Sequence, residues 1–218
     1  MVIMTTKQIP AKDRRKELIL IAYDHIAKRG FEGLRVRAVA AELGINNATL
    51  HYYFPTKEDL IKGVVDYMIE KFSTSNSFES AAKESPDAWK EMRAELEDAR
   101  HRFRDARDQI VVFTELLIRS LRDPAIAQIF KKLDESWRGY LVSIIEQGIR
   151  QGIFRAELDP TVTATLIMLQ IKGFGYQMLG ETDQTIANEV FDQMALQVES
   201  WLSGKFNESQ KARSRSVK

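Results

Sequence analysis

Cysteine is absent from the sequence, and histidine occurs only three times. Without thiols the chain can form neither disulfide bonds nor thiolate metal sites. The histidines His25, His51 and His101 fall in different predicted helices and do not make a metal triad. We therefore expect no metal and no other cofactor.

Long apolar runs are missing as well. No window reaches the ~18 apolar residues of a membrane-spanning helix, and residues 1–15 lack the apolar core of a signal peptide. We expect a cytoplasmic protein that does not bind a membrane. The sequence also has no GxSxG, HExxH, phosphate-loop or dinucleotide-binding glycine pattern. Because no nucleophile–base pair or metal set can be assembled, an enzyme is disfavoured.

Charge is distributed unevenly along the chain. The formal net charge is +1, yet residues 1–56 carry nine Lys/Arg against five Asp/Glu, residues 57–203 carry 18 against 25, and residues 204–218 carry five against one. Nucleic acid attracts the two ends and repels the middle. We predict a DNA-binding domain over 1–56 with a basic arm over 1–11, a regulatory domain over 57–203, and a disordered basic tail over 204–218.

A helix-turn-helix is predicted over residues 36–57. In its first half, apolar side chains recur at spacings of three and four, which indicates one short helix. Gly44 ends this helix, because a left-handed residue just past a helix end costs glycine little. Asn46 or Asn47 then caps a second short helix over 48–54.

The second helix exposes polar side chains. Leu50 and Phe54, one turn apart, are expected to face inward, and Tyr52 is expected to pack against the first helix of the domain. The outward residues present amides, a hydroxyl, an imidazole and a phenol, which suit base edges and phosphates in a major groove better than a core. Just beyond, Thr56 and Asp59 form a capping box that starts the next helix.

The run from Arg14 to Leu60 resembles the DNA-binding domain of a TetR-family transcriptional regulator. The matching segment reads ILIAYDHIAKRGFEGLRVRAVAAELGINNATLHYYFPTKEDL and spans an N-terminal helix, the helix-turn-helix and the start of a fourth helix. The family usually has Thr or Ser just before Val36, where this chain has Arg35, and Tyr where it has His51. The resemblance implies a homodimer that binds a near-palindromic double-stranded DNA operator.

A small set of residues is predicted to contact DNA. Arg37 is the first choice for a base contact, because its planar fork can bond two acceptors on one guanine edge; the alternative is a solvated arginine. Ala48 and Thr49 can meet a thymine methyl or a phosphate, and Asn47 can reach a base or only cap its helix. The remaining candidates are expected at phosphates: Arg35, His51, Tyr53 and Lys57.

The rest of the chain also shows helical periodicity, and no period-two stretch is long enough for a strand. We predict an all-α fold of about nine helices, with an N-terminal three-helix helix-turn-helix DNA-binding domain and a C-terminal helical ligand-binding and dimerisation domain. Residues 73–85, rich in Ser and Asn, are expected to form a loop. The other helices are expected at about 12–29, 57–72, 86–103, 107–122, 124–152, 160–179 and 182–202.

The helix over 160–179 is apolar nearly all round, so it needs partners on two sides. We expect it and the helix over 182–202 to pair with their copies in a second chain as a two-fold four-helix bundle, which the resemblance also implies. The alternative is that both helices only close the core of one chain. The candidate interface residues are Leu166, Ile167, Ile171, Phe191, Met194, Val198 and Trp201.

Aromatic and methionine side chains of the C-terminal part supply material for an apolar pocket, although the same spacing is typical of a core. Polar residues stranded in apolar runs, such as Glu115 and Lys172, can orient a ligand or reach solvent. The expected effector is a small hydrophobic or amphipathic molecule. The candidate ligand-binding residues are Trp89, Phe103, Phe113, Thr114, Trp137, Met168, Gln170, Phe174 and Met178.

These patterns together predict a sequence-specific homodimeric repressor that a ligand releases from its operator. One alternative remains open at this point. The chain could be an architectural or scaffold protein that binds DNA without sequence preference, held there by its basic ends.

Overall fold

The computed structural model describes residues 11–73, 87–181 and 183–204. Residues 1–10 of the predicted arm, nearly all of the predicted Ser/Asn-rich loop and residues 205–218 of the predicted tail lie outside this part of the chain. Within it, every regular element is an α-helix, so the all-α prediction is confirmed. None of the described helices is long and apolar enough to span a membrane.

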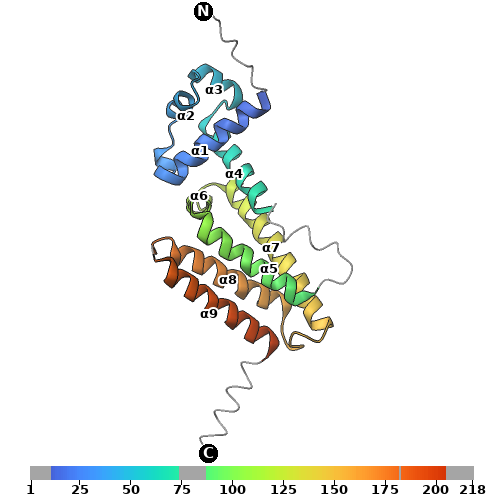
Figure 1. Cartoon of the computed structure of the whole chain (residues 1–218). Coiled ribbons are helices and arrows are strands. Elements are labelled where there is room, and N and C mark those ends of the chain that lie inside the picture. The colour runs from blue at the N-terminus through green and yellow to red at the C-terminus, as the bar shows by residue number, and fades with distance from the viewer. Residues whose placement is uncertain (1–10, 74–86, 182, 205–218) are drawn as a thin grey trace, which may run out of the picture.

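The helices follow one another along an elongated molecule, with α1–α3 at one end and α8 and α9 towards the other (Figure 1). They are α1 (Ala11–Gly33), α2 (Val36–Glu42), α3 (Asn47–Tyr53), α4 (Lys57–Ser73), α5 (Ala88–Asp105), α6 (Arg107–Ser120), α7 (Pro124–Arg150), α8 (Pro160–Met178) and α9 (Gln184–Ser203).

Local capping signals set the boundaries of the helix-turn-helix. Gly44 follows α2 with a φ of 68°, as its position past the helix end requires. The cap of α3 is Asn46, whose side-chain oxygen accepts from the backbone N–H of Thr49 at 2.8 Å. Thr56 and Asp59 form the predicted capping box, each accepting the other's backbone N–H at 3.0 Å.

Gly30 breaks α1 instead of ending it. Its φ of 65° and ψ of 179° are not helical, and one further turn carries the chain on to Gly33. The helix predicted to stop near Arg29 therefore continues past the break. This break lies against Glu115 of α6.

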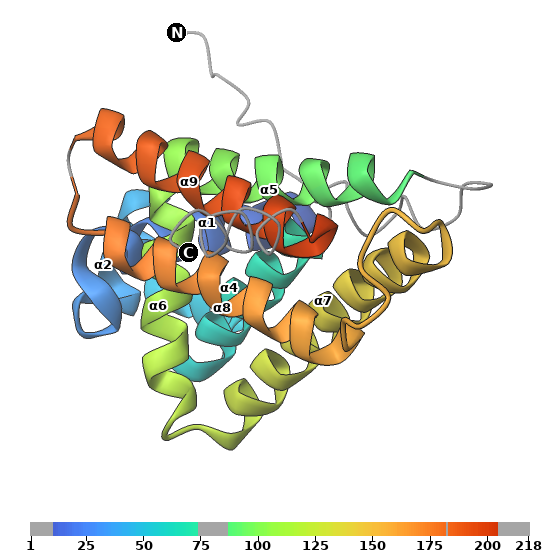
Figure 2. The same cartoon turned by 90° about the horizontal axis from the view of Figure 1, so that it is seen from below.

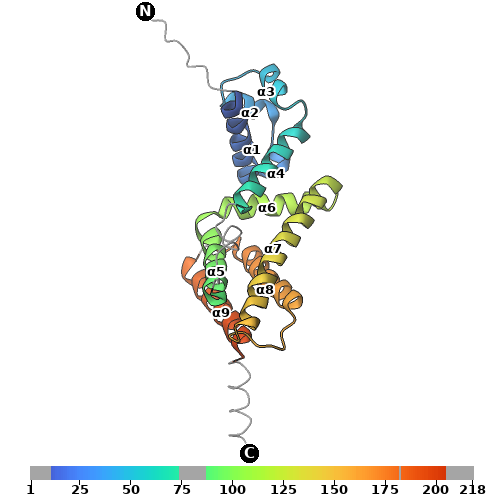
Figure 3. The same cartoon turned by 90° about the vertical axis from the view of Figure 1, so that its right-hand side faces the viewer.

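Two hydrophobic cores hold the helices together. The first joins α1–α4 to Val112 and Leu116 of α6 and Ile126 of α7, and the second joins α5, α7, α8 and α9. Figure 3 shows α6 lying across the molecule between α1 and α4 on one side and α5, α8 and α9 on the other. Since Leu60 of α4 is buried in the first core, the boundary predicted just before α4 runs through a packed unit.

The core of the single chain contains most of the residues predicted at a chain–chain interface, which corrects that choice. Helical spacing identifies an apolar face, but it cannot say whether the face meets its own chain or another when the helix is apolar nearly all round. Of the predicted set, Leu166 is exposed and Trp201 is half-buried. The following residues belong to the second core: Ile167, Ile171, Phe191, Met194 and Val198.

A different set of apolar side chains on these two helices faces outward. Figure 2 shows α8 and α9 side by side. Along α8 these exposed residues recur at spacings of three and four, which places them on one face of the helix. We call this set the α8–α9 apolar face; it comprises Val162, Leu166, Leu169, Ile186, Val190 and Leu196.

Candidate functional sites: a reading surface and a cavity

Helix α3 presents its polar side to solvent at the end of the molecule. Leu50 is fully buried beneath it, whereas Ala48 and His51 are exposed and Asn47 and Thr49 are half-buried. One prediction for this helix was wrong. Tyr52 does not pack against α1: it is 81% exposed, and its ring forms a T-shaped pair with that of Tyr53 at a centroid distance of 5.2 Å.

Tyr52 therefore belongs to the outward surface of α3. Its ring lies beside predicted DNA contacts, and a phenol at this place can meet the same phosphates and base edges that they were expected to meet. Packing was predicted because tyrosine has a large apolar ring. The sequence alone does not show which side of a short helix faces solvent.

The three basic candidates around the helix-turn-helix differ in their surroundings. Arg37 is exposed on α2 and points away from the core. Arg35 stands at the N-cap of α2 without a side-chain cap bond, and its guanidinium donates to the carbonyl of Glu32. Lys57, at the start of α4, donates from Nζ to the carbonyl of Phe31 at 3.3 Å.

Buried His25 links α1, on which it lies, to α2. Its Nε2 lies 2.9 Å from a carboxylate oxygen of Glu42 at the end of α2, while the ring itself is 4% exposed. Near α3, His51 Nδ1 lies 3.1 Å from the carbonyl oxygen of Pro55, so this ring is oriented by the turn before α4.

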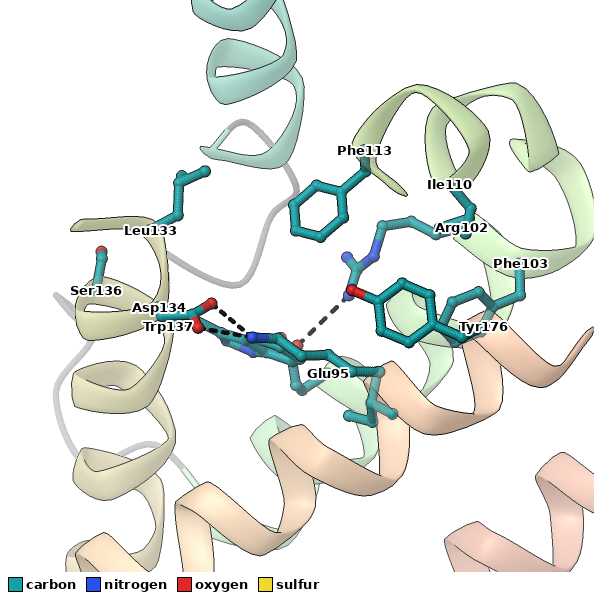
Figure 4. A pocket seen from close by; sticks show the side chains of 13 residues that line it. Glu95, Arg102, Phe103, Ile110, Phe113, Leu133, Asp134, Ser136, Trp137 and Tyr176 are labelled. Atoms are coloured by element: carbon teal, nitrogen blue, oxygen red, sulfur yellow. Dashed lines mark hydrogen bonds and ion pairs between the residues drawn. The ribbon is translucent and has the colours of Figure 1, made fainter. Parts of the chain in front are cut away.

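A cavity of about 120 Å³ opens between α5, α6, α7 and α8 (Figure 4). Its wall is mainly aromatic and aliphatic, with charged groups gathered on one side. The lining residues are Glu95, Arg102, Phe103, Ile110, Phe113, Leu133, Asp134, Ser136, Trp137, Ile171, Lys172, Gly175 and Tyr176. We call it the main cavity.

Two charged pairs form the polar side of the main cavity. The indole N–H of Trp137 donates to Oε1 of Glu95 at 2.9 Å, and the Arg102 guanidinium lies 3.6 Å from the same oxygen. Beside them, Lys172 Nζ donates to both carboxylate oxygens of Asp134 at 2.7 Å and lies 5.9 Å from the centroid of the Trp137 ring. Figure 4 shows Arg102 and the phenol of Tyr176 on the same side of the space.

Burial also affects the acidity of the wall. Desolvation, with a smaller contribution from the Asp134 carboxylate, raises the pKa of Tyr176 above its ordinary value. The phenol therefore stays a hydrogen-bond donor at neutral pH. A ligand in the main cavity thus contacts a mainly apolar wall and, on one side, a group of positively and negatively charged side chains.

The predicted ligand-binding residues divide into those that line the main cavity and those that do not. Phe103, Phe113 and Trp137 line it. Thr114 turns its hydroxyl back to the carbonyl of Ile110. The other predicted residues do not line this cavity: Trp89, Met168, Gln170, Phe174 and Met178.

Most of the polar lining was not predicted from the sequence. Glu95 carried a usable signal, because it lies between Met92 and Ala99 on the buried stripe of α5, where a carboxylate needs a partner. Asp134 and Arg102 carried none, since their roles depend on how α5, α7 and α8 meet.

A second cavity lies next to the first and shares Phe103, Ile110 and Gly175 with it. Phe174 and Met178, predicted as ligand contacts, line this second space. Gly175 is required where the two meet: a Cβ there would lie 2.5 Å from the ring of Phe103. The ring of Phe103 therefore forms part of the partition between the two cavities.

The fold and its surfaces define a helical DNA-binding regulator with a helix-turn-helix at one end and a cavity-bearing domain at the other. Residues 19–64 match the family described as bacterial regulatory proteins, tetR family, and residues 84–202 match the one described as BetI-type transcriptional repressor, C-terminal. The chain belongs to the TetR family of transcriptional regulators.

Similar proteins carry the same description. The chain is 24% identical over 184 residues to the HTH-type transcriptional regulator CymR of Pseudomonas putida, covering 80% of this chain and 83% of that protein. It is 27% identical over 155 residues to the HTH-type transcriptional repressor KstR2 of Mycobacterium tuberculosis, covering 67% and 72%. These relatives are named as regulators, not as enzymes.

Among solved structures, a transcriptional regulator from Saccharomonospora viridis in complex with choline is similar to this chain. It has a TM-score of 0.72 at 25% identity, with 87% of this chain and 95% of that one covered. A TetR transcription regulator from Haloarcula marismortui shares the fold, with a TM-score of 0.74 at 21% identity and coverage of 88% and 98%.

Proposed function

We propose that this TetR-family regulator is a homodimeric repressor that a small amphipathic molecule, bound in the main cavity, releases from its operator. Helix α3 then enters the major groove, and Arg37 and the outward residues of α3 contact bases and phosphates. In such a dimer the two α3 helices lie about 34–36 Å apart, one turn of DNA, which fits a near-palindromic operator.

The α8–α9 apolar face supports the dimer. Exposed apolar residues that gather on two neighbouring helices are a feature of protein–protein contacts. Because a two-fold contact uses the same patch on both subunits, α8 and α9 pair with their own copies as a four-helix bundle. Leu166 and Trp201 remain in the proposed interface, joined by outward residues such as Leu169 and Val190.

One observation carries the coupling between the cavity and the DNA-binding end. Phe113 of α6 lines the main cavity and also packs against the first hydrophobic core, with its ring 4.8 Å from that of Phe130. A molecule that displaces Phe113 therefore acts on a helix that also supports α1 and α4. Release requires that the molecule bind the DNA-free arrangement more tightly, typically with about 1–3 kcal/mol of coupling.

The dimensions and lining of the cavity indicate the class of effector. The volume of about 120 Å³ is close to the ~150 Å³ of an apolar cavity that holds benzene. Aromatic walls and charged pairs of both signs suit a small molecule with an apolar part and a polar end. The choline bound to the Saccharomonospora viridis regulator makes choline the first compound to test.

The decisive experiment selects bound sequences from random duplex DNA and titrates the winner against scrambled DNA at two salt concentrations. We expect the selected sequence to be near-palindromic and the protein to bind it much more tightly than scrambled DNA. Choline and a panel of small amphipathic compounds are then tested for a shift in melting temperature and for release of the winner. Equal, steeply salt-dependent binding to both DNAs would contradict the proposal and favour an architectural protein.

A further inference from the structure

The break in α1 places a backbone N–H against another helix. Gly30 is not helical, and Phe31 begins the turn that follows the break. Glu115 of α6 supplies the acceptor: the Phe31 N–H donates to its Oε2 at 3.2 Å. Phe31 is itself buried, and this hydrogen bond is partly buried.

The Glu115 carboxylate fits closely against the break. A Cβ added at Gly30 would lie 3.1 Å from one carboxylate oxygen and 3.2 Å from the other. The absence of a side chain at Gly30 therefore lets both oxygens approach the backbone. The φ of 65° independently favours glycine at this position.

Phe31 is also held from the DNA-binding side. Its carbonyl accepts from Lys57 Nζ at 3.3 Å, which fixes the lysine at the first residue of α4. Its ring lies beneath the guanidinium of Arg119, 5.5 Å from the ring centroid. Arg119 is one turn beyond Glu115 on α6, and its guanidinium reaches a carboxylate oxygen of Glu58 on α4 at 3.9 Å.

The same helix faces the main cavity through other residues. Ile110 and Phe113 line the cavity, while Glu115 and Arg119 meet Phe31. A shift or rotation of α6 caused from the cavity therefore changes the position of the Phe31 backbone. Since Lys57 is anchored to that backbone, the change reaches a residue that the proposed function places on DNA.

We propose that Glu115 is a positioning residue for operator binding. Through the backbone of Phe31, it places Lys57 at the start of α4 for contact with DNA. The proposal rests on the proposed function, because it requires an operator. Its content is specific: the hydrogen bond from the Phe31 N–H to Glu115, and not the general packing of α6, orients the start of α4 for its phosphate contact.

The test uses the full chain and the selected operator. Glu115→Ala removes the acceptor, Glu115→Gln keeps a carbonyl oxygen that can accept the same N–H, and Thr114→Ala is the neighbouring control on α6. We expect Glu115→Ala to weaken operator binding about tenfold, a typical effect of losing a hydrogen bond to a charged group. Glu115→Gln and Thr114→Ala should stay within about twofold of the unchanged protein.

A double-mutant cycle with Lys57→Met separates positioning from general stability. If Glu115 acts through Lys57, the loss caused by Glu115→Ala shrinks when Lys57 is already Met. Hydrogen exchange of the full chain should show faster exchange at the Phe31 amide in Glu115→Ala alone. Fully multiplicative losses in the cycle would overturn the proposal, as would a lower melting temperature with unchanged operator affinity at 25 °C.

Failure of the proposed function gives a different pattern. In that case the unchanged protein would itself bind operator and scrambled DNA equally. If instead the unchanged protein prefers its operator and Glu115→Ala behaves like Thr114→Ala, the proposed function stands and the role of Glu115 is refuted.

Discussion

The indole N–H of Trp137 on α7 donates to Oε1 of Glu95 on α5 at 2.9 Å, and this glutamate is 1% exposed. A buried carboxylate is costly unless donors surround it. The bond therefore joins two helices of the second core and fixes the polar side of the main cavity at the same time.

Trp137→Phe tests the value of this bond. The substitution keeps an aromatic ring but removes a donor from a buried charge, so we expect the free energy of unfolding to fall by about 1–3 kcal/mol in urea titrations. Trp89→Phe is the control, because the contact of residue 89 with Phe154, at a centroid distance of 4.7 Å, needs only a ring. Equal losses in the two variants would show that ring size, not the bond to Glu95, matters.

The raised pKa of Tyr140 predicts how the stability of the protein changes with pH in the alkaline range. Burial, followed by the nearby carboxylates of Glu95, Glu91 and Asp98, raises the pKa of this phenol above its ordinary value of 10.0. Below pH 10 the phenol is neutral in both states, so it adds no pH dependence. Above pH 10 the unfolded chain loses the proton first, and the free energy of unfolding therefore falls as the pH rises.

Melting temperatures measured from about pH 8 to pH 11 check this expectation, with Tyr140→Phe as the comparison. The variant lacks the ionisable group, so its stability should fall less steeply above pH 10. Tyr23, whose pKa burial also raises, remains in both proteins and contributes equally. Identical slopes would contradict the role given to Tyr140.

Alanine substitution of two glycines of α7 is expected to have opposite effects on the free energy of unfolding. A Cβ at Gly148 would lie 2.1 Å from the ring of buried Phe154, whereas a Cβ at Gly139 would meet no atom within 4 Å. Gly148→Ala should lower the free energy of unfolding by about 1–3 kcal/mol through overpacking. Gly139→Ala should raise it by about 0.5–1 kcal/mol, because alanine is the better helix former. Urea titration of both variants checks the contrast, which fails if the two changes have the same sign.

The parts of the fold that the sequence predicted correctly depend on short-range chemistry. The capping box of Thr56 and Asp59 and the turn at Gly44 involve residues within one turn of each other, and both are confirmed. Helix periods are equally local. These signals were sufficient for the all-α class and for the helix-turn-helix.

The parts that the sequence did not predict depend on packing between distant segments. Trp137 and Glu95 are 42 positions apart, and Glu115 and Phe31 are 84 apart. No local pattern marks such pairs. The same limit explains the interface error: period 3.6 placed Ile167 and Leu166 on apolar faces but did not show that only Leu166 points away from the chain's own core.

Leu169→Glu tests the proposed dimer. Leu169 is 58% exposed on the α8–α9 apolar face, so a glutamate there is tolerated by the single chain but places a charge in the two-fold contact. We expect sedimentation to show monomers, and operator affinity to fall because two half-sites are no longer bound together. Leu121→Glu, at an 81% exposed leucine just after α6, should leave both properties unchanged. A dimer that survives Leu169→Glu would place the interface elsewhere.

Variants of Arg37 and Arg35 distinguish a contact to DNA bases from a contact to phosphates. Arg37→Ala should cost about 1–3 kcal/mol on the selected operator and little on scrambled DNA, because a base contact is sequence-specific. Arg35→Ala should weaken binding to both DNAs alike and reduce the salt slope by about 1, as expected for a lost phosphate contact. Anisotropy titrations at several salt concentrations measure both quantities. If Arg37→Ala weakens both DNAs equally, Arg37 contacts the backbone and the sequence is read by α3 alone.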